Sequence, residues 1–356
     1  MSAAQDRPLL TFAIAAFNQE QFIREAVEAA FAQTYSPLEI VLSDDCSRDR
    51  TFEIMKEMAA TYRGPHRIIL NRNRKQRCIG GHINAVVEVS HGELIIGAAG
   101  DDVSAPNRTQ AAFEAWEWSD RRATSIHTDI IQIDEKGSPV AQVYKPDGQG
   151  SLGRFTEQPA DAVSYVRTLK PCVLGCSHTF SRELFRRFGD LPDEIIHEDN
   201  AMSLRSAMIG RIVYTNEELV KYRVHGSNVF VTSWERGMNL PTLARQENRM
   251  RRDFRTREIM YNGFLRDLEK ARQMGVLKES EYQDARQEAE RKRRRFGVQR
   301  EFVESGVFAK SRLLFHLKEA GVSREEARIL TARLLPLPVL LRVQLLRSYL
   351  AAARGR

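Results

Sequence analysis

Short apolar runs alternate with amphipathic segments through the first third of the chain, and this alternation limits the possible folds more than any other feature. Residues 9–17 are almost all apolar, as expected for a strand that is covered on both faces. Residues 21–33 follow with apolar side chains at helical spacing. Repetition of this order predicts an α/β fold, Rossmann-like, in which helices cover both faces of a mainly parallel sheet. Further strands are predicted at residues 38–42 and 67–70 and from residue 93, and further helices at residues 52–62, 83–89 and 107–118.

The pattern is less regular in the next part of the chain. Residues 125–133 alternate polar and apolar side chains, which predicts a strand at the margin of the sheet. Residues 134–153 are rich in Gly, Pro and Lys and predict a long surface loop. Earlier in the chain, Gly80-Gly81 predicts a flexible turn. The remaining predicted elements are helices at residues 161–169 and 182–188, a helix that ends near residue 208, and strands at residues 211–213 and 220–224.

Composition excludes several classes of protein. Hydrophobic residues make up 42% of the 356 positions and charged residues 28%, as in soluble proteins with a packed core. The four cysteines form neither a disulfide framework nor a paired zinc site, and Cys172 and Cys176 are expected to be small core residues. The N-terminus has no signal-peptide pattern, and no apolar run reaches transmembrane length. The sequence therefore predicts a cytoplasmic protein.

Candidate ligand-binding residues stand where several of the predicted strands end. Phe17 lies at the end of the first strand, Asp44-Asp45 at the end of the second, and Asp101-Asp102 follow the strand that starts at residue 93. Because the carboxyl ends of parallel strands meet at one edge of a sheet, one nucleotide-sized ligand could touch all three positions. Paired carboxylates on a tight turn suit a hard divalent cation that also holds phosphate oxygens. The alternative is that these carboxylates cap the helices that follow.

Two common nucleotide-binding motifs are absent from the sequence. No G-x-G-x-x-G follows the first strand, which argues against a dinucleotide-binding fold, and no G-x-x-x-x-G-K-[ST] indicates a P-loop NTPase. Four other motifs occur in order along the chain: Ala15-Ala16-Phe17-Asn18, Gln33-Thr34-Tyr35, the stretch from Ser43 to Thr51, and Ala99-Gly100-Asp101-Asp102. Together they resemble family 2 glycosyltransferases of the GT-A fold. The resemblance covers roughly residues 8–230.

This resemblance implies a binding site for a nucleoside diphosphate sugar, with a UDP-linked sugar favoured. Ala15 and Phe17 would line the nucleoside base, and Asp45 would accept a hydrogen bond from a pyrimidine ring nitrogen. Asp102 would bind Mn²⁺ or Mg²⁺ on the diphosphate, with Asp101 nearer the ribose or the sugar. Many members of the family have a further Asp at the position of Ala99, so this loop carries one carboxylate fewer than the common pattern.

The second half of the resembling region supplies candidates for the chemical step. An inverting transfer needs a carboxylate that takes the proton of the acceptor hydroxyl, and the resemblance implies Asp199 for this general base. Glu198 would position the acceptor. His225 would complete the metal site. The alternatives are that Glu198 and Asp199 are simply carboxylates in the first turn of a helix, where the helix dipole stabilises negative charge, and that His225 is an ordinary core or surface residue.

The last third of the chain differs from the rest. Residues 245–270, 279–302, 311–320 and 323–335 predict charged helices, the last with Ser323 as N-cap and Glu326 in the capping-box position. Residues 291–295 are all Arg or Lys, within a chain of formal net charge +7. The helices could pack on themselves or on a second copy of the chain. Alternatively they form a basic platform on the inner face of the plasma membrane, near a lipid-linked acceptor. Nucleic-acid binding is not expected, because no aromatic residues interleave with the basic run.

These observations predict two parts: a GT-A nucleotide-sugar-binding catalytic domain at residues 1–233, and a helical, basic C-terminal region at residues 234–356. The predicted activity is inverting, metal-dependent transfer of a sugar to a hydroxyl of a glycan or a lipid-linked acceptor, in surface polysaccharide synthesis. The alternative is a non-catalytic module that binds a nucleotide or a glycan and carries a helical assembly scaffold.

Overall fold

The computed structural model of the chain describes residues 7–144, 153–226, 228 and 240–305, together with residues 316–317, 319–323, 326–327 and 330. The chain divides into two compact units. The first comprises the residues up to 228 together with residues 266–285, and the second comprises residues 229–265 and those from 286 onward. The predicted boundary at residue 233 stays a prediction.

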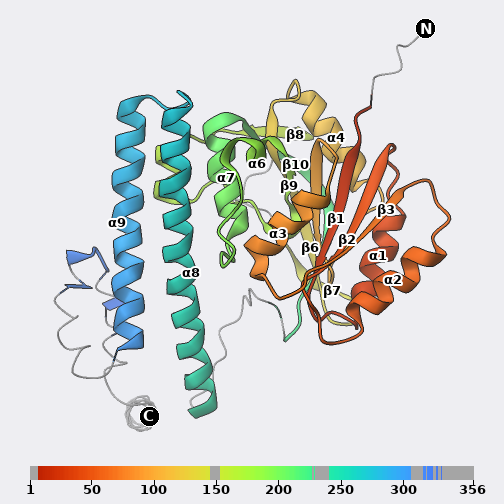
Figure 1. The fold of residues 1–356 in the computed structure, drawn as a ribbon, viewed down its shortest axis with the longest axis horizontal. Coiled ribbons are helices and arrows are strands. Elements are labelled where there is room, and N and C mark those ends of the chain that lie inside the picture. Colours follow the sequence, from red (N-terminus) through yellow and green to blue (C-terminus); the bar gives the residue numbers. More distant parts are fainter. Residues whose placement is uncertain are drawn as a thin grey trace. The chain divides into compact units, whose positions relative to one another are not determined.

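A mixed sheet forms the centre of the first unit (Figure 1). Its main path runs in the order β3-β2-β1-β4-β9-β6-β10-β5, with β7 paired to β6 and β8 paired to β10. The strands β3, β2, β1 and β4 are mutually parallel, as the sequence predicts. The strands are β1 (Leu10–Ala16), β2 (Leu38–Asp44), β3 (Arg67–Arg72), β4 (Leu94–Ala99), β5 (Val103–Ser104), β6 (Ala123–Ile133), β7 (Pro139–Tyr144), β8 (Phe155–Gln158), β9 (Thr179–Ser181) and β10 (Arg211–Arg223).

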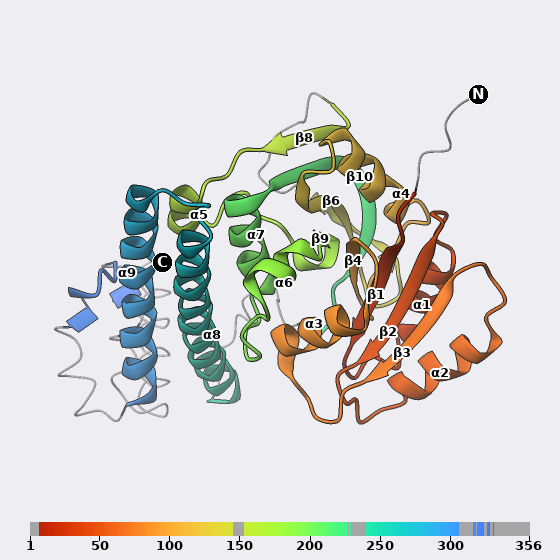
Figure 2. The same ribbon diagram turned by 45° about the horizontal axis from the view of Figure 1, so that its top comes forward.

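Helices cover both faces of this sheet, which confirms the predicted fold class (Figure 2). Leu10, Phe12 and Ile14 of β1 face one cluster of buried apolar residues, which also takes in side chains from α1, α2 and α4. The helix α3 contacts β1, β2 and β3, and Figure 2 shows it on the opposite side from α1 and α2. The helices of this region are α1 (Ile23–Phe31), α2 (Thr51–Thr61), α3 (Cys78–Val89), α4 (Arg108–Trp118), α5 (Ala162–Thr168), α6 (Glu183–Phe188) and α7 (Glu198–Ile209).

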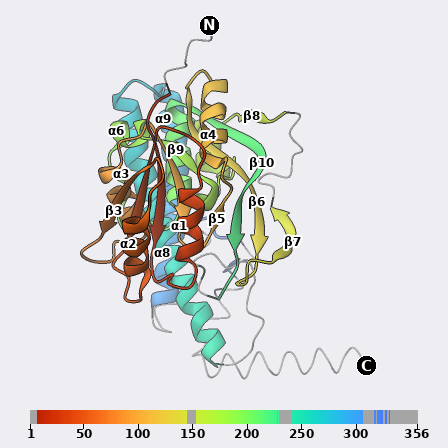
Figure 3. The ribbon, with the colours of Figure 1, turned by 90° about the vertical axis from the view of Figure 1, so that its right-hand side faces the viewer.

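The part of the sheet beyond β4 corrects three predictions. The strand β6 does not lie at the margin, because β9 pairs with it on one side and β10 on the other. The predicted strands 211–213 and 220–224 are the two ends of one strand, β10, which continues through register shifts near Thr215 and Glu218. The predicted surface loop contains β7, and Figure 3 shows β10, β6 and β7 side by side.

The glycine pair 80–81 does not form a turn but belongs to α3. The backbone N–H of Gly80 donates to the carbonyl of Ile195 at 2.9 Å, and that of Gly81 donates to the carbonyl of Asp193 at 3.1 Å. A Cβ on Gly80 would lie only 2.3 Å from the carbonyl oxygen of Pro192. The glycines are therefore required by the close approach of the chain that leads into α7.

Two long helices dominate the described part of the C-terminal region: α8 (Leu240–Gln273) and α9 (Glu279–Glu304). In the second unit, the rings of Tyr261 and Phe296 stack with centroids 5.7 Å apart. The capping box is confirmed, because Ser323 and Glu326 exchange side-chain to backbone hydrogen bonds. Most of the predicted helices 311–320 and 323–335 lies outside the described residues.

Several charges of the basic run are paired within the chain. Arg291 bonds Glu288, and Arg295 bonds Glu326. These ion pairs weigh against a fully cationic surface, although contact with a membrane or with a second copy stays a prediction. Among the residues that the structure describes, no helix is long and apolar enough to cross a bilayer.

A buried ion pair attaches the end of α8 to α7 within the first unit. The Arg205 side chain of α7 is fully buried, and its Nε donates to Asp267 at 2.7 Å. The same guanidinium donates to the carbonyls of Gly189 and Asp190. Burial lowers the pKa of Arg205, and the negative charge of Asp267 opposes this effect. The buried guanidinium therefore needs the Asp267 carboxylate as its counter-charge. The last turns of α8 therefore help to hold the helix that begins with Glu198 and Asp199.

Replacing Asp267 with asparagine is expected to destabilise the protein by about 3–5 kcal/mol, because a buried guanidinium loses its counter-charge. Urea unfolding would measure the change. Glu57→Gln is the matched control: Glu57 pairs with Arg50 at the surface, where both side chains are more than half exposed. Removing such a pair costs at most about 1 kcal/mol. Equal losses for the two variants would contradict a structural role for the buried pair.

Candidate active site

The carboxyl ends of β1 and β2 form one side of the candidate site. Ala15 lies between Ser43 of β2 and Ala99 of β4 in the strand register. Phe17 follows β1 and is 36% exposed, which is unusual for a large apolar side chain next to a core strand. An exposed aromatic face at a strand end can stack on a planar ligand ring.

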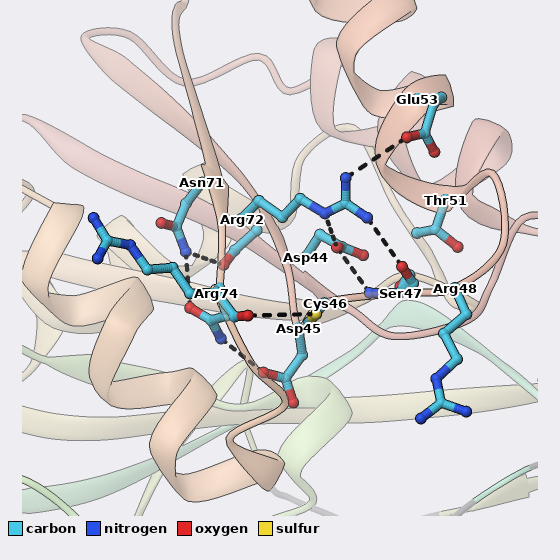
Figure 4. Close-up of polar contacts among 12 residues, drawn as sticks. Asp44, Asp45, Cys46, Ser47, Arg48, Thr51, Glu53, Asn71, Arg72 and Arg74 are labelled. Carbon is cyan, nitrogen blue, oxygen red and sulfur yellow. Dashed lines mark hydrogen bonds and ion pairs between the residues drawn. The ribbon is translucent and has the colours of Figure 1, made fainter.

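Asp44 and Asp45 have different roles. Figure 4 shows Asp44 directed towards Arg72 and Ser47, and its Oδ2 accepts the Ser47 N–H at 3.0 Å. Asp45 points elsewhere and accepts hydrogen bonds from the Asn73 amide at 2.7 Å and the Arg77 N–H at 2.9 Å. Burial raises the pKa of Asp45, and these hydrogen bonds oppose the rise. Asp45 thus orders the loop before α3, and its predicted bond to a base nitrogen is untested.

The loop after β4 places two carboxylates next to the end of β10. The Oδ1 atom of Asp102 accepts the backbone N–H of Arg223 at 2.9 Å. Its Oδ2 atom is buried and has no hydrogen-bond partner within the described part of the chain. Burial, followed by the negative charge of Asp101, raises the pKa of Asp102 well above its ordinary value. A buried carboxylate oxygen without a partner is costly unless a cation or a donor meets it.

His225 lies beside this loop. Its Nε2 atom is 2.9 Å from Asp101 Oδ2, and both side chains are nearly buried. The structure thus brings Asp101, Asp102 and His225 to one place, with the histidine against Asp101. Within the described ranges, no group of three or more His, Cys, Asp or Glu side chains could hold a metal ion by itself. Cations that act on diphosphates commonly take only one or two carboxylates from the protein, and substrate phosphates and water complete their shell. The donor set therefore fits Mn²⁺ or Mg²⁺ held jointly with a diphosphate.

The first turn of α7 carries the other pair of acidic residues. Asp199 Oδ1 accepts the Asn200 N–H at 2.7 Å, and the carboxylate also accepts the Gly175 N–H. A helix N-terminus stabilises negative charge, yet burial outweighs this effect and raises the pKa of Asp199 to about 6. Burial and the adjacent Asp199 also raise the pKa of Glu198, whose Oε2 atom has no hydrogen-bond partner within the described residues. A Cβ on Gly175 would lie 2.6 Å from Glu198 Oε1, so a side chain at this position would displace the Glu198 carboxylate.

Cys176 connects the two acidic groups electrostatically. Burial and then the charge of Asp102 raise the pKa of its thiol, and the charges of Asp199 and Asp101 add to the rise. All three carboxylates therefore lie within electrostatic reach of one side chain. The short 3₁₀ turn that carries Cys176 (Gly175–Ser177) contacts β4, β6 and β10, which explains this central place.

Two arginines of the site were not predicted from the sequence. Arg108 is buried beneath the Asp101-Asp102 loop and donates to Ser104 and to the carbonyl of Gly97. Arg223 is also fully buried and donates to the carbonyl of Asp101. From the sequence alone, an Arg within a strand or at the start of a helix cannot be told from one that is exposed to solvent. Only the buried carbonyl groups that these two side chains bond show that they support the loop.

Comparison with known proteins identifies the family. The family described as glycosyl transferase family 2 matches residues 11–188. This span is half of the chain and includes the β1, β2 and β4 loops of the site. The chain belongs to glycosyl transferase family 2.

Individual relatives agree with this assignment. An uncharacterized glycosyltransferase of Nostoc sp. is 27% identical over 218 residues, which are 60% of this chain and 64% of the relative. The chain thus spans just under two thirds of that relative. An uncharacterized glycosyltransferase of Rickettsia typhi is 24% identical over 277 residues, covering 78% of this chain and 77% of the relative. The crystal structure of S. aureus TarS 1–349 in complex with UDP-GlcNAc has a TM-score of 0.50 at 14% identity, and the match covers 87% of this chain and 90% of the TarS 1–349 chain. This likeness supports the GT-A fold.

Proposed function

We propose that the protein is an inverting glycosyltransferase, which transfers a sugar from a nucleoside diphosphate to a hydroxyl of an acceptor. The observation that carries the proposal is that the Gly175–Ser177 turn contacts β4, which leads into the Asp102 loop, and also donates the Gly175 N–H to Asp199, so two carboxylates that are far apart in the sequence lie around one turn. One site then contains a place for the diphosphate and a separate base. Family membership supports the same reaction class.

Asp199 is the proposed general base. Its pKa of about 6 leaves it ionised at neutral pH and still basic enough to take a proton from a hydroxyl. The Asn200 and Gly175 N–H groups orient the carboxylate. Glu198 has a raised pKa, and its Oε2 has no hydrogen-bond partner among the described residues; this side chain is proposed to position the acceptor by a hydrogen bond.

Asp102 and His225 are the proposed protein ligands of a divalent cation, and Asp101 holds the His225 ring. When bound, such a cation neutralises the charge that builds up on a departing diphosphate. Phe17 and Ala15 are proposed to contact the nucleoside, and Asp45 to recognise a pyrimidine ring, which favours a UDP-linked donor. The proposed acceptor is a glycan or a lipid-linked glycan of a surface polysaccharide.

The melting temperature of the protein, measured with UDP- and GDP-sugars in the presence and absence of Mn²⁺, tests the donor proposal. Stabilisation by a nucleotide sugar only when Mn²⁺ is present would support it. Hydrolysis of the bound donor then separates an enzyme from a non-catalytic binding module, because a module would bind the donor and leave it intact. No stabilisation by any nucleotide sugar would contradict the proposal.

The pH dependence of the transfer gives an independent test of the base. Because burial raises the pKa of Asp199 to about 6, the ionised base is lost as the pH falls through that value. At saturating Mg²⁺, kcat/KM is expected to fall about tenfold for each pH unit below 6. Donor affinity measured over the same pH range is the control for titration of Asp45 and Asp102. An acid limb near pH 4 would assign the base to another group.

A further inference from the structure

Arg223, the last residue of β10, connects four segments around the Asp101-Asp102 loop. Its Nε donates to the Asp101 carbonyl at 2.9 Å, and its Nη1 donates to the carbonyls of Asp134 and Glu135 at 3.3 and 3.0 Å. Its Nη2 donates to Glu25 of α1 at 2.8 Å. Every nitrogen of the guanidinium group is thus bonded, in a side chain with no exposed surface.

The backbone of Arg223 acts on the same loop. Its N–H donates to Asp102 Oδ1 at 2.9 Å, and this bond leaves Oδ2 as the oxygen without a partner. Its carbonyl accepts the Asn228 side-chain amide at 3.0 Å, while Asn228 Oδ1 accepts the His225 N–H. One residue therefore fixes the rotamer of Asp102 and anchors the turn that carries His225.

Phe22 lies between Arg223 and His225. The Arg223 guanidinium carbon is 5.0 Å from the centre of the Phe22 ring, and the His225 ring is 4.9 Å from it. Phe22 precedes α1, and its backbone N–H bonds the carbonyl of Gln19 at 2.9 Å. The ring is thus held by the helix start and packs against the histidine, whose Nε2 faces Asp101.

We propose that Arg223 and Phe22 are positioning residues that hold Asp102 and His225 in the arrangement which binds the divalent cation. This inference rests on the proposed function. Neither residue needs to touch the cation: Arg223 sets the loop and the carboxylate rotamer, and Phe22 sets the imidazole plane. Lysine cannot replace Arg223, because an ammonium group cannot reach the backbone carbonyls of two segments and the Glu25 carboxylate with the geometry of a planar fork. The positive charge also lowers the cost of two adjacent carboxylates before the cation arrives.

The test measures Mn²⁺ affinity directly, from the electron paramagnetic resonance signal of free Mn²⁺ titrated with the full-length protein and saturating UDP. Phe22→Leu and Arg223→Lys are each expected to weaken Mn²⁺ binding about 10–100-fold, the usual effect of losing a group that orients a metal ligand. Phe22→Tyr keeps the ring and is expected to keep the affinity. The control is Phe52→Leu. The guanidinium of Arg72 lies 4.9 Å from the centre of the Phe52 ring, so this variant also loses an aromatic ring next to an arginine. Phe52 belongs to α2 and not to the Asp102 loop.

The outcomes separate the inference from the proposed function. If the wild-type protein binds Mn²⁺ with UDP or GDP and both variants bind it equally well, the positioning role is wrong and the function stands. If both variants melt at lower temperature without metal yet keep the wild-type Mn²⁺ affinity, the two residues are only structural. If the wild-type protein shows no metal-dependent nucleotide binding, the proposed function and the inference fail together. If Arg223→Lys does not fold, Phe22→Leu decides.

Discussion

Asparagine in place of Asp199 is expected to lower kcat about a thousandfold while donor affinity stays within about twofold of wild type, because a positioned general base contributes about 10²–10⁴-fold. The amide has nearly the shape of the carboxylate, and its oxygen can still accept the Asn200 N–H bond. What it loses is the ability to take a proton. Single-turnover kinetics with saturating donor would measure the chemical step, and calorimetry would measure donor binding.

The matched control is Asp193→Asn, in the segment that leads into α7. Asp193 is mostly exposed, and its Oδ1 bonds Arg77 and Asn84, which an amide oxygen can also do. This variant is expected to keep wild-type turnover. If Asp199→Asn also kept it, Asp199 would not be the base. If instead Asp199→Asn lost donor binding, the carboxylate would belong to the donor half of the site.

The parallel half of the sheet could be predicted from sequence because its central strands β1 and β2 are buried on both faces and each strand is followed by a helix. Leu10, Phe12 and Ile14 face one layer, and the alternate residues Thr11 and Ala13 are equally buried. The half beyond β4, which mixes parallel and antiparallel pairs, could not be predicted in the same way. The strand β9 has only three residues, too few for any periodicity, and its pairing with β4 and β6 joins distant parts of the chain. In β10 the register shifts interrupt the pattern in the middle of one strand.

The candidate site was predictable where its residues stand in ordered motifs at strand ends. The structure brings Asp101, Asp102 and His225 together, with the His225 ring bonded to Asp101, while their roles at a metal stay predictions. The supporting residues were not predictable, because their roles depend on contacts far away in the sequence. Arg223 bonds Glu25, which is 198 positions earlier. The pairing of Arg205 with Asp267 likewise attaches α7 to a residue beyond the predicted boundary at residue 233.

Asparagine in place of Asp102 is expected to have opposite effects on stability and on binding. Without metal, the variant should be more stable than wild type by about 1–3 kcal/mol, because a buried unpaired charge costs more than a buried neutral amide. Burial penalises the ionised Asp102 carboxylate, whose Oδ2 has no hydrogen-bond partner among the described residues, and Asp101 adds a second negative charge beside it. The amide carries no charge, and its oxygen can still accept the Arg223 N–H. Thermal unfolding in EDTA would measure this gain.

With Mn²⁺ and UDP present, the same variant should lose more than about 100-fold in metal affinity, because loss of a direct ligand costs more than loss of a group that orients one. The wild-type protein then becomes the more stable of the two, since a ligand that binds only the folded state stabilises it. Asp134→Asn is the control, because only its backbone carbonyl meets Arg223. Reversal of the stability order by metal and nucleotide is hard to explain unless Asp102 binds the cation. A variant that is less stable in EDTA would show instead that the carboxylate serves the fold, and the metal site would have to be sought elsewhere along the strand ends.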